Sequence, residues 1–98
     1  MSLPVRFLPE ARDEYDAAAD FYEQQRAGLG ADFIACIREV LQRISANPQL
    51  HATVYQDVRK AVVRRFPYVV LYREEAGEVI IIAVFHTARD PSVWQSRI

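Results

Sequence analysis

The stretch Val79–Phe85, with the sequence VIIIAVF, constrains the fold more than any other part of the chain. All seven residues are apolar and five are β-branched, a composition that favours an extended backbone. A strand with one solvent-exposed face alternates apolar and polar side chains, but this segment has no polar side chain that could face the solvent. The pattern therefore predicts a central strand over Glu78–His86 that is covered on both faces.

The segments before this strand predict its neighbours in the sheet. Two extended stretches lie at Val58–Phe66 and Tyr68–Arg73, and Glu74–Gly77 supplies a glycine-containing turn into the central strand. Pro48–Asp57 has no clear period and is interpreted as a loop. Near the N-terminus, the alternation over Val5–Phe7 predicts one more short strand.

Apolar residues between Val5–Phe7 and Pro48 recur every three or four positions, which predicts two amphipathic helices. The first begins at Pro9, since proline suits the first helical position, and the second stops before Pro48. The two apolar stripes consist of Leu8, Ala11, Tyr15, Ala18 and Tyr22, and of Phe33, Ile37, Val40, Leu41 and Ile44. The link Gln25–Gly30 contains two glycines and should join the helices as an antiparallel hairpin.

The order strand, helix, helix, strand, strand, strand predicts a single α+β domain over residues 1–98. The helical hairpin is expected to pack on one face of a small, mainly antiparallel sheet. A chain of 98 residues buries only about 60–65% of the surface that it exposes when unfolded. It therefore has room for one small core but not for a separate cofactor domain.

The charges are balanced overall but unevenly distributed. The net charge is −1, which argues against a free-standing, non-specific nucleic-acid binder. Residues 1–48 hold eight acidic residues against five arginines, whereas residues 49–98 hold seven bases against five acidic residues. Eleven of the twelve bases are arginine, whose planar fork suits carboxylates and phosphates. Recognition of an acidic or phosphorylated partner and a simple compositional bias both remain open.

Several kinds of chemistry are not predicted. Cys36 is the only cysteine, so one chain can form neither an internal disulfide nor a thiolate metal cluster, and its place in the second helix indicates a buried thiol. There is no phosphate-binding loop, dinucleotide fingerprint or zinc-protease motif, so no cofactor and no metal are expected. The longest apolar run is far shorter than the ~20 residues that span a membrane, so a cytoplasmic protein without membrane partners is expected.

Basic residues of the two predicted strands Val58–Phe66 and Tyr68–Arg73 are candidates for binding. Because strand side chains alternate, Arg59 and Arg65 should share one face while Lys60 and Arg64 share the other. Arg73 ends the next strand. The alternative is that these charges only protect an edge strand from aggregation.

His86 ends the central strand and is followed closely by Arg89 and Asp90. An imidazole, a guanidinium and a carboxylate at one rim could cleave a phosphodiester by acid–base chemistry. The alternative is structural, with His86 capping the strand and Arg89 pairing with Asp90 or a helix terminus.

Aromatic residues allow two interpretations. Tyrosines interleaved with arginines can stack on single-stranded bases, but their positions here indicate packing between helices and sheet. These tyrosines are Tyr15, Tyr22, Tyr68 and Tyr72. Trp94 is expected to plug the core, although an exposed tryptophan would be a natural contact anchor.

Two segments resemble a known family. Arg64–Tyr72 (RRFPYVVLY) and His86–Trp94 (HTARDPSVW) resemble the RelE/ParE family of small bacterial toxins. The resemblance implies the toxin of a type II toxin–antitoxin module, of the plasmid-stabilisation type, that is neutralised by an antitoxin with a disordered C-terminal tail. RelE-like members cleave messenger RNA on the ribosome, whereas ParE-like members poison DNA gyrase without known nucleolytic residues.

The resemblance favours the ParE-like branch. RelE-like members carry an arginine three positions before a strand tyrosine, and Val69 stands there, three before Tyr72. Lys60 is the only lysine, and no tyrosine follows Tyr72. The prediction is therefore a gyrase-binding toxin without catalytic residues. An mRNA interferase and an inactive family member are the alternatives.

The candidate residues follow from this interpretation. Those predicted to bind the target or the antitoxin are Arg59, Lys60, Arg64, Arg65, Arg73, His86, Arg89 and Trp94. If the chain were a nuclease, its metal-independent catalytic set would be Arg64, Arg65, His86 and Arg89.

Overall fold

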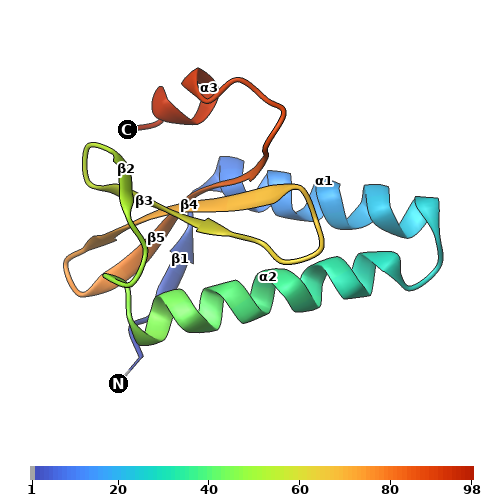
Figure 1. Cartoon of the computed structure of the whole chain (residues 1–98), viewed down its shortest axis with the longest axis horizontal. Helices are drawn as coiled ribbons and strands as arrows, with labels where there is room; N and C mark the ends of the chain where they lie inside the picture. The colour runs from blue at the N-terminus through green and yellow to red at the C-terminus, as the bar shows by residue number, and fades with distance from the viewer. Residues whose placement is uncertain (1) are drawn as a thin grey trace.

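The computed structural model describes residues 2–98 and confirms the predicted α+β architecture. A five-stranded sheet has the order β1-β5-β4-β3-β2, in which only β1 and β5 are parallel. Helices α1 and α2 form an antiparallel hairpin over one face, while α3 lies on the opposite side of the sheet (Figure 1). The elements are β1 (Val5–Phe7), α1 (Pro9–Gln25), α2 (Leu29–Ala46), β2 (Thr53–Tyr55), β3 (Val58–Val62), β4 (Tyr68–Glu75), β5 (Glu78–His86) and α3 (Ser92–Gln95).

Strand β5 is the central element that its sequence predicts. Every residue from Val79 to Phe85 is buried, because β4 and β1 flank the strand and apolar side chains cover both of its faces. β4 pairs with it from Tyr68 opposite His86 to the turn, where Ala76 and Gly77 adopt positive φ angles of 52° and 78°. Glycine tolerates this left-handed backbone, which explains why the turn falls there.

The sheet separates two apolar clusters. On the hairpin side, Phe33 lies at the centre of a cluster that includes the helix stripes and Tyr72. On the other side, Val69, Leu71 and Phe85 pack with Trp94. The four tyrosines predicted to be core residues all lie in or against the hairpin-side cluster, so the interpretation that they pack between helices and sheet is confirmed.

The junction between the two helices depends on one close contact. Glu23 of α1 accepts hydrogen bonds from the backbone N–H groups of Gly28 and Gly30, at 3.0 and 3.1 Å, and so caps the start of α2. A Cβ on Gly30 would lie 2.6 Å from the carbonyl oxygen of Ala19. Only glycine lets the two backbones approach this closely.

Gly30→Ala is therefore expected to lower the free energy of unfolding by about 1–3 kcal/mol, because the helices must separate to admit the methyl group. Urea unfolding followed by circular dichroism would measure the change. Ala31→Ser, an exposed substitution one residue later, should change stability by no more than about 0.5 kcal/mol. Equal stability of the two variants would contradict the close contact.

The loop between α2 and β2 contains His51, and protonation of this histidine destabilises the folded state. His51 stacks edge-on against the ring of Tyr72, and its Nε2 is buried without a hydrogen-bond partner among residues 2–98. Burial, aided by the charge of Arg43, lowers the pKa of His51 from its ordinary value of 6.5. The unfolded chain thus binds this proton more readily than the folded one.

Stability should consequently fall as the pH drops below the unfolded value of about 6.5. In His51→Leu, the loss of stability between about pH 7.5 and pH 5.5 should be smaller than in the wild type. Urea midpoints measured across this range would show the difference. If the urea midpoints of the two proteins changed equally with pH, His51 would make no contribution to the pH dependence of stability.

Three boundaries differ from the prediction. β2 lies inside the segment predicted as a loop, β4 runs on to Glu75, and β3 ends at Val62 instead of Phe66. Arg65 has a positive φ of 73°, and the Val63 N–H bonds to the Tyr68 carbonyl, so the chain turns sharply before Pro67. A proline supplies no N–H for strand pairing, which is consistent with the early end of β3.

Candidate binding surfaces

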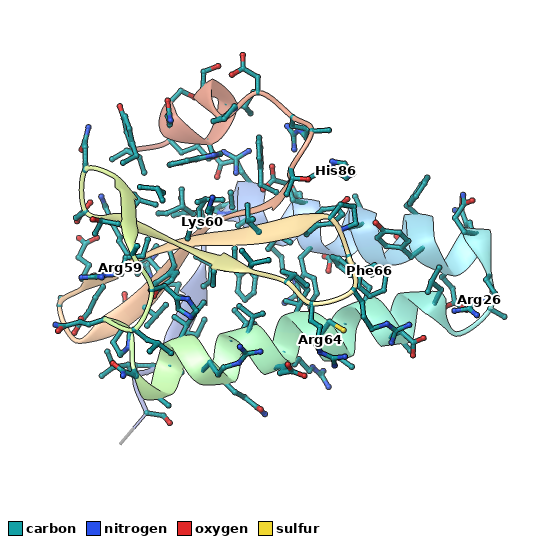
Figure 2. All side chains as sticks on the ribbon, in the orientation of Figure 1. Arg26, Arg59, Lys60, Arg64, Phe66 and His86 are labelled. Carbon is teal, nitrogen blue, oxygen red and sulfur yellow. The ribbon has the colours of Figure 1, made fainter. Side chains whose placement is uncertain are left out.

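The early end of β3 moves two predicted site residues away from the sheet. Arg64 and Arg65 lie in the turn beside α2, so the prediction that they alternate across strand faces is wrong. Arg64, labelled beside α2 in Figure 2, is 3.2 Å from the Glu39 carboxylate. Arg65 is 3.5 Å from the Asp32 carboxylate. The hydrogen bond from Arg64 lowers the pKa of Glu39, which keeps the exposed pair ionised.

Two further predicted binding residues bond within the chain. Arg59 donates to the His51 carbonyl at 2.6 Å and so holds the loop that precedes β2. Arg73 pairs with Glu75, two residues later on the same strand, at 3.0 Å. Arg59 therefore has a structural role, and the charge of Arg73 is locally compensated.

A third group of charges closes the free edge of β5. β1 pairs with β5 only as far as Ile81, which leaves backbone groups beyond it without a strand partner. The Val84 N–H donates to the Glu14 carboxylate, and the Ile82 carbonyl accepts from Arg97. Side chains of an ion pair thus replace the missing strand at this edge.

Glu14 is the centre of this group. Both of its oxygens bond Arg97, at 2.9 and 2.8 Å, and one also lies 3.0 Å from Arg89. The side chains of Glu14 and Arg97 are only 13% and 11% exposed, and the hydrogen bonds that Arg97 donates to Glu14 raise the pKa of Arg97. The acidic residue of helix α1 therefore fixes the position of the C-terminal segment.

Sequence reasoning missed the roles of Glu14 and Arg97. One signal was available: Glu14 lies three residues after Ala11 and four before Ala18, which puts a carboxylate on the buried stripe of α1. Nothing local to Arg97 indicates its partner, because the two residues lie 83 positions apart.

The residues after β5 only partly follow the prediction. Arg89 does not pair with Asp90, which instead accepts a hydrogen bond from the Ser92 N–H at 3.0 Å. That bond lowers the pKa of Asp90 and orders the start of α3. Trp94 is 5% exposed and packs edge-on against Tyr55, so the core-plug interpretation is confirmed, and the tryptophan is not the exposed side chain that a contact anchor would require.

A groove between the sheet and α3, on the face opposite the helical hairpin, brings four of the predicted residues together. Lys60, His86, Arg89 and Trp94 line it, and its volume is about 300 Å³. The Ala88 N–H donates to Nδ1 of His86 at 3.0 Å, so the proton of the neutral ring lies on Nε2. Arg64 and Arg65 do not line the groove, and the four residues of the predicted nuclease set are therefore not assembled in one place.

Within residues 2–98 no three metal-binding side chains form a group that could hold an ion, and no helix is long and apolar enough to cross a membrane.

The architecture places the chain in the class of small α+β domains in which a helical hairpin covers one face of a mixed sheet. It matches a structure of the chromosomal ParDE toxin–antitoxin system from P. aeruginosa with a TM-score of 0.64 at 14% sequence identity, covering 87% of this chain and 96% of that one. At this identity the likeness establishes a shared fold. A family model described as the ParE toxin of the type II toxin–antitoxin system parDE matches residues 5–91, and the chain therefore belongs to the ParE toxin family. No curated protein matches the sequence significantly.

Proposed function

We propose that this protein is the toxin of a type II toxin–antitoxin module, that it is silenced by a cognate antitoxin, and that it acts in the cytoplasm by binding and inhibiting DNA gyrase. The observation that carries the proposal is the family match over residues 5–91. The antitoxin system of the structural neighbour supports the partnership.

The distribution of the candidate catalytic groups supports binding over RNA cleavage. A metal-independent nuclease needs a base, an acid and a cation within reach of one phosphate. Here Arg64 and Arg65 pair with carboxylates of α2, while His86 and Arg89 lie at the end of β5. His86 is the one imidazole in the lining of the groove, and no carboxylate lines it to serve as a second acid–base group.

A supercoiling assay tests the gyrase proposal directly. Purified protein added to gyrase and relaxed plasmid should block supercoiling or accumulate cleaved complexes in proportion to its concentration. Full supercoiling at a large excess of the protein would overturn the gyrase claim. Cleavage of transcripts after induction, lost in His86→Ala, would identify an mRNA interferase instead.

The antitoxin proposal has its own test. Co-expression with the small protein encoded beside this gene should yield a stable complex, because a disordered tail that folds on binding can cover a large surface. Growth arrest on expression of the toxin alone, relieved by that partner, would support neutralisation. Failure to co-purify and to relieve arrest would count against it.

A further inference from the structure

The groove between the sheet and α3 has apolar walls and cationic ends. Val69, Leu71 and Phe85 of the sheet lie on one side of it, and Trp94 of α3 lies on another. Val54 of β2 forms part of the rim and is 46% exposed, a high value for a valine. Apolar surface that remains open to solvent beside a groove is typical of a contact site.

The charge at the groove is positive. Lys60 carries one positive charge, and the group of Glu14, Arg89 and Arg97 carries a net positive charge because one carboxylate contacts two guanidiniums; no Asp or Glu lines the groove itself. Lys60 forms no ion pair within residues 2–98. In a protein whose net charge is −1, this concentrates positive potential at one concave place.

The positions of Lys60 and His86, near the two ends of the groove, set a spacing for the ligand. Lys60 pairs with Leu71 of β4, which pairs with Ala83 of β5, and His86 lies three residues further along β5. Two strand spacings of about 4.8 Å and three residues of about 3.3 Å put the Cα atoms of Lys60 and His86 about 14 Å apart. An extended chain covers this distance in about four residues.

The cationic group at the His86 end is preorganised. Glu14 lies 3.0 Å from the Arg89 guanidinium, which also stacks on Phe85 with its carbon 4.3 Å from the ring centroid. The hydrogen bond to Nδ1 leaves Nε2–H of His86 as a donor. A ligand that binds these fixed groups loses little side-chain entropy.

The character of the walls distinguishes between anionic ligands. Single-stranded nucleic acids bind through bases stacked on exposed aromatic rings. Phe85 and Trp94 are almost fully buried and offer no open ring face. Among the valine, leucine, phenylalanine and tryptophan residues that line the groove, the aliphatic Val54 and Val69 are the most exposed, at 46% and 9%, so the groove suits an aliphatic side chain, and its cationic ends suit carboxylates.

We propose that this groove binds an extended segment of a partner protein in which two acidic residues, four positions apart, flank an aliphatic residue. Side chains at positions i, i+2 and i+4 of an extended chain point the same way, so all three face the groove. The first carboxylate meets Lys60, the aliphatic side chain lies over the apolar walls, and the second carboxylate meets His86 and Arg89. This inference concerns a surface of the toxin and does not depend on gyrase being the target.

The tryptophan provides a direct readout, since Trp94 is the only one in the chain and lines the groove. The probe is the peptide acetyl-Glu-Thr-Leu-Thr-Glu-amide, titrated against the full-length protein while tryptophan emission is recorded. A saturable change is expected below about 10 mM, weakened at least about fivefold when both glutamates are replaced by glutamine. No saturable change up to that concentration, or equal binding of the two peptides, would overturn the proposal.

Matched variants locate the site. Lys60→Glu and Val54→Asp should each weaken binding at least about fivefold. Arg38→Glu, the same charge reversal on the exposed face of α2, and Leu50→Asp, on an exposed leucine outside the groove, should leave it within about twofold. Equal effects of the Lys60 and Arg38 variants, or tighter binding of a single-stranded oligoribonucleotide than of the peptide, would overturn the proposal. No gyrase is used, so failure here is distinguishable from failure of the proposed function.

Discussion

Replacing Glu14 with alanine will lower the free energy of unfolding by about 3–5 kcal/mol, because it leaves the Arg97 guanidinium buried without a counter-charge. The variant also removes the acceptor for the Val84 N–H and the partner of Arg89. One substitution therefore breaks the contact between α1 and the C-terminal segment and reopens the edge of β5. Since small domains are stable by only about 5–15 kcal/mol, a loss of this size is a large share of the total.

Urea unfolding would measure the loss, and the matched control is Glu39→Ala. Glu39 also contacts two arginines, Arg43 and Arg64, but on an exposed surface where ion pairs contribute little. Emission from Trp94 should shift toward the red in Glu14→Ala if the C-terminal segment loosens, because the indole would become exposed to water. Equal urea midpoints for the two alanine variants would contradict the structural role of the Glu14 pair.

The parts of the fold that were predictable are those specified by local patterns. The central strand follows from the β-branched run Val79–Phe85, and the helices follow from stripes that repeat every three or four residues. The apolar residues of the central strand are buried and those of the helix stripes are buried or partly buried, which confirms both predictions, because each apolar face must be covered by a neighbouring element. Their boundaries were also marked locally, by Pro9 at the start of α1 and by the Ala76–Gly77 turn before β5.

The side-chain partners were not predictable because they depend on contacts between distant residues. Alternation along one long strand placed Arg64 and Arg65 on opposite faces, but β3 ends before them and the chain turns toward α2. β2 was missed because three residues with a bulge carry little periodicity. Arg97 could not be assigned, since its partner is brought near only by the folding of the whole domain.

The motif that carries the family resemblance is largely structural. Phe66 and Tyr68 of the Phe-Pro-Tyr element both pack against Phe33 of α2, with ring centroids 5.2 and 5.1 Å apart. The element thus joins the turn after β3 to the helical hairpin. Its presence marks the fold, whereas the charges that line the groove between the sheet and α3 mark the proposed contact surface.

Phe33→Ala tests this role and is expected to lower the free energy of unfolding by about 3–5 kcal/mol. Phe33 is completely buried, and its ring also lies 5.3 Å from that of Tyr22, so truncation leaves a cavity between the helices and the sheet. The rigid aromatic neighbours cannot collapse into the space, which places the cost near the top of the usual range. With a total stability of about 5–15 kcal/mol, the variant should be marginally folded at 25 °C.

The chain contains its own control in Phe21, which is 55% exposed on α1. Phe21→Ala removes the same atoms but leaves no enclosed cavity, so its urea midpoint should stay close to that of the wild type. If Phe33→Ala is too unstable to purify, Phe33→Leu should still fold with a smaller loss, because leucine fills part of the space. Wild-type stability in either Phe33 variant would mean that the aromatic cluster does not hold the turn after β3 against the hairpin.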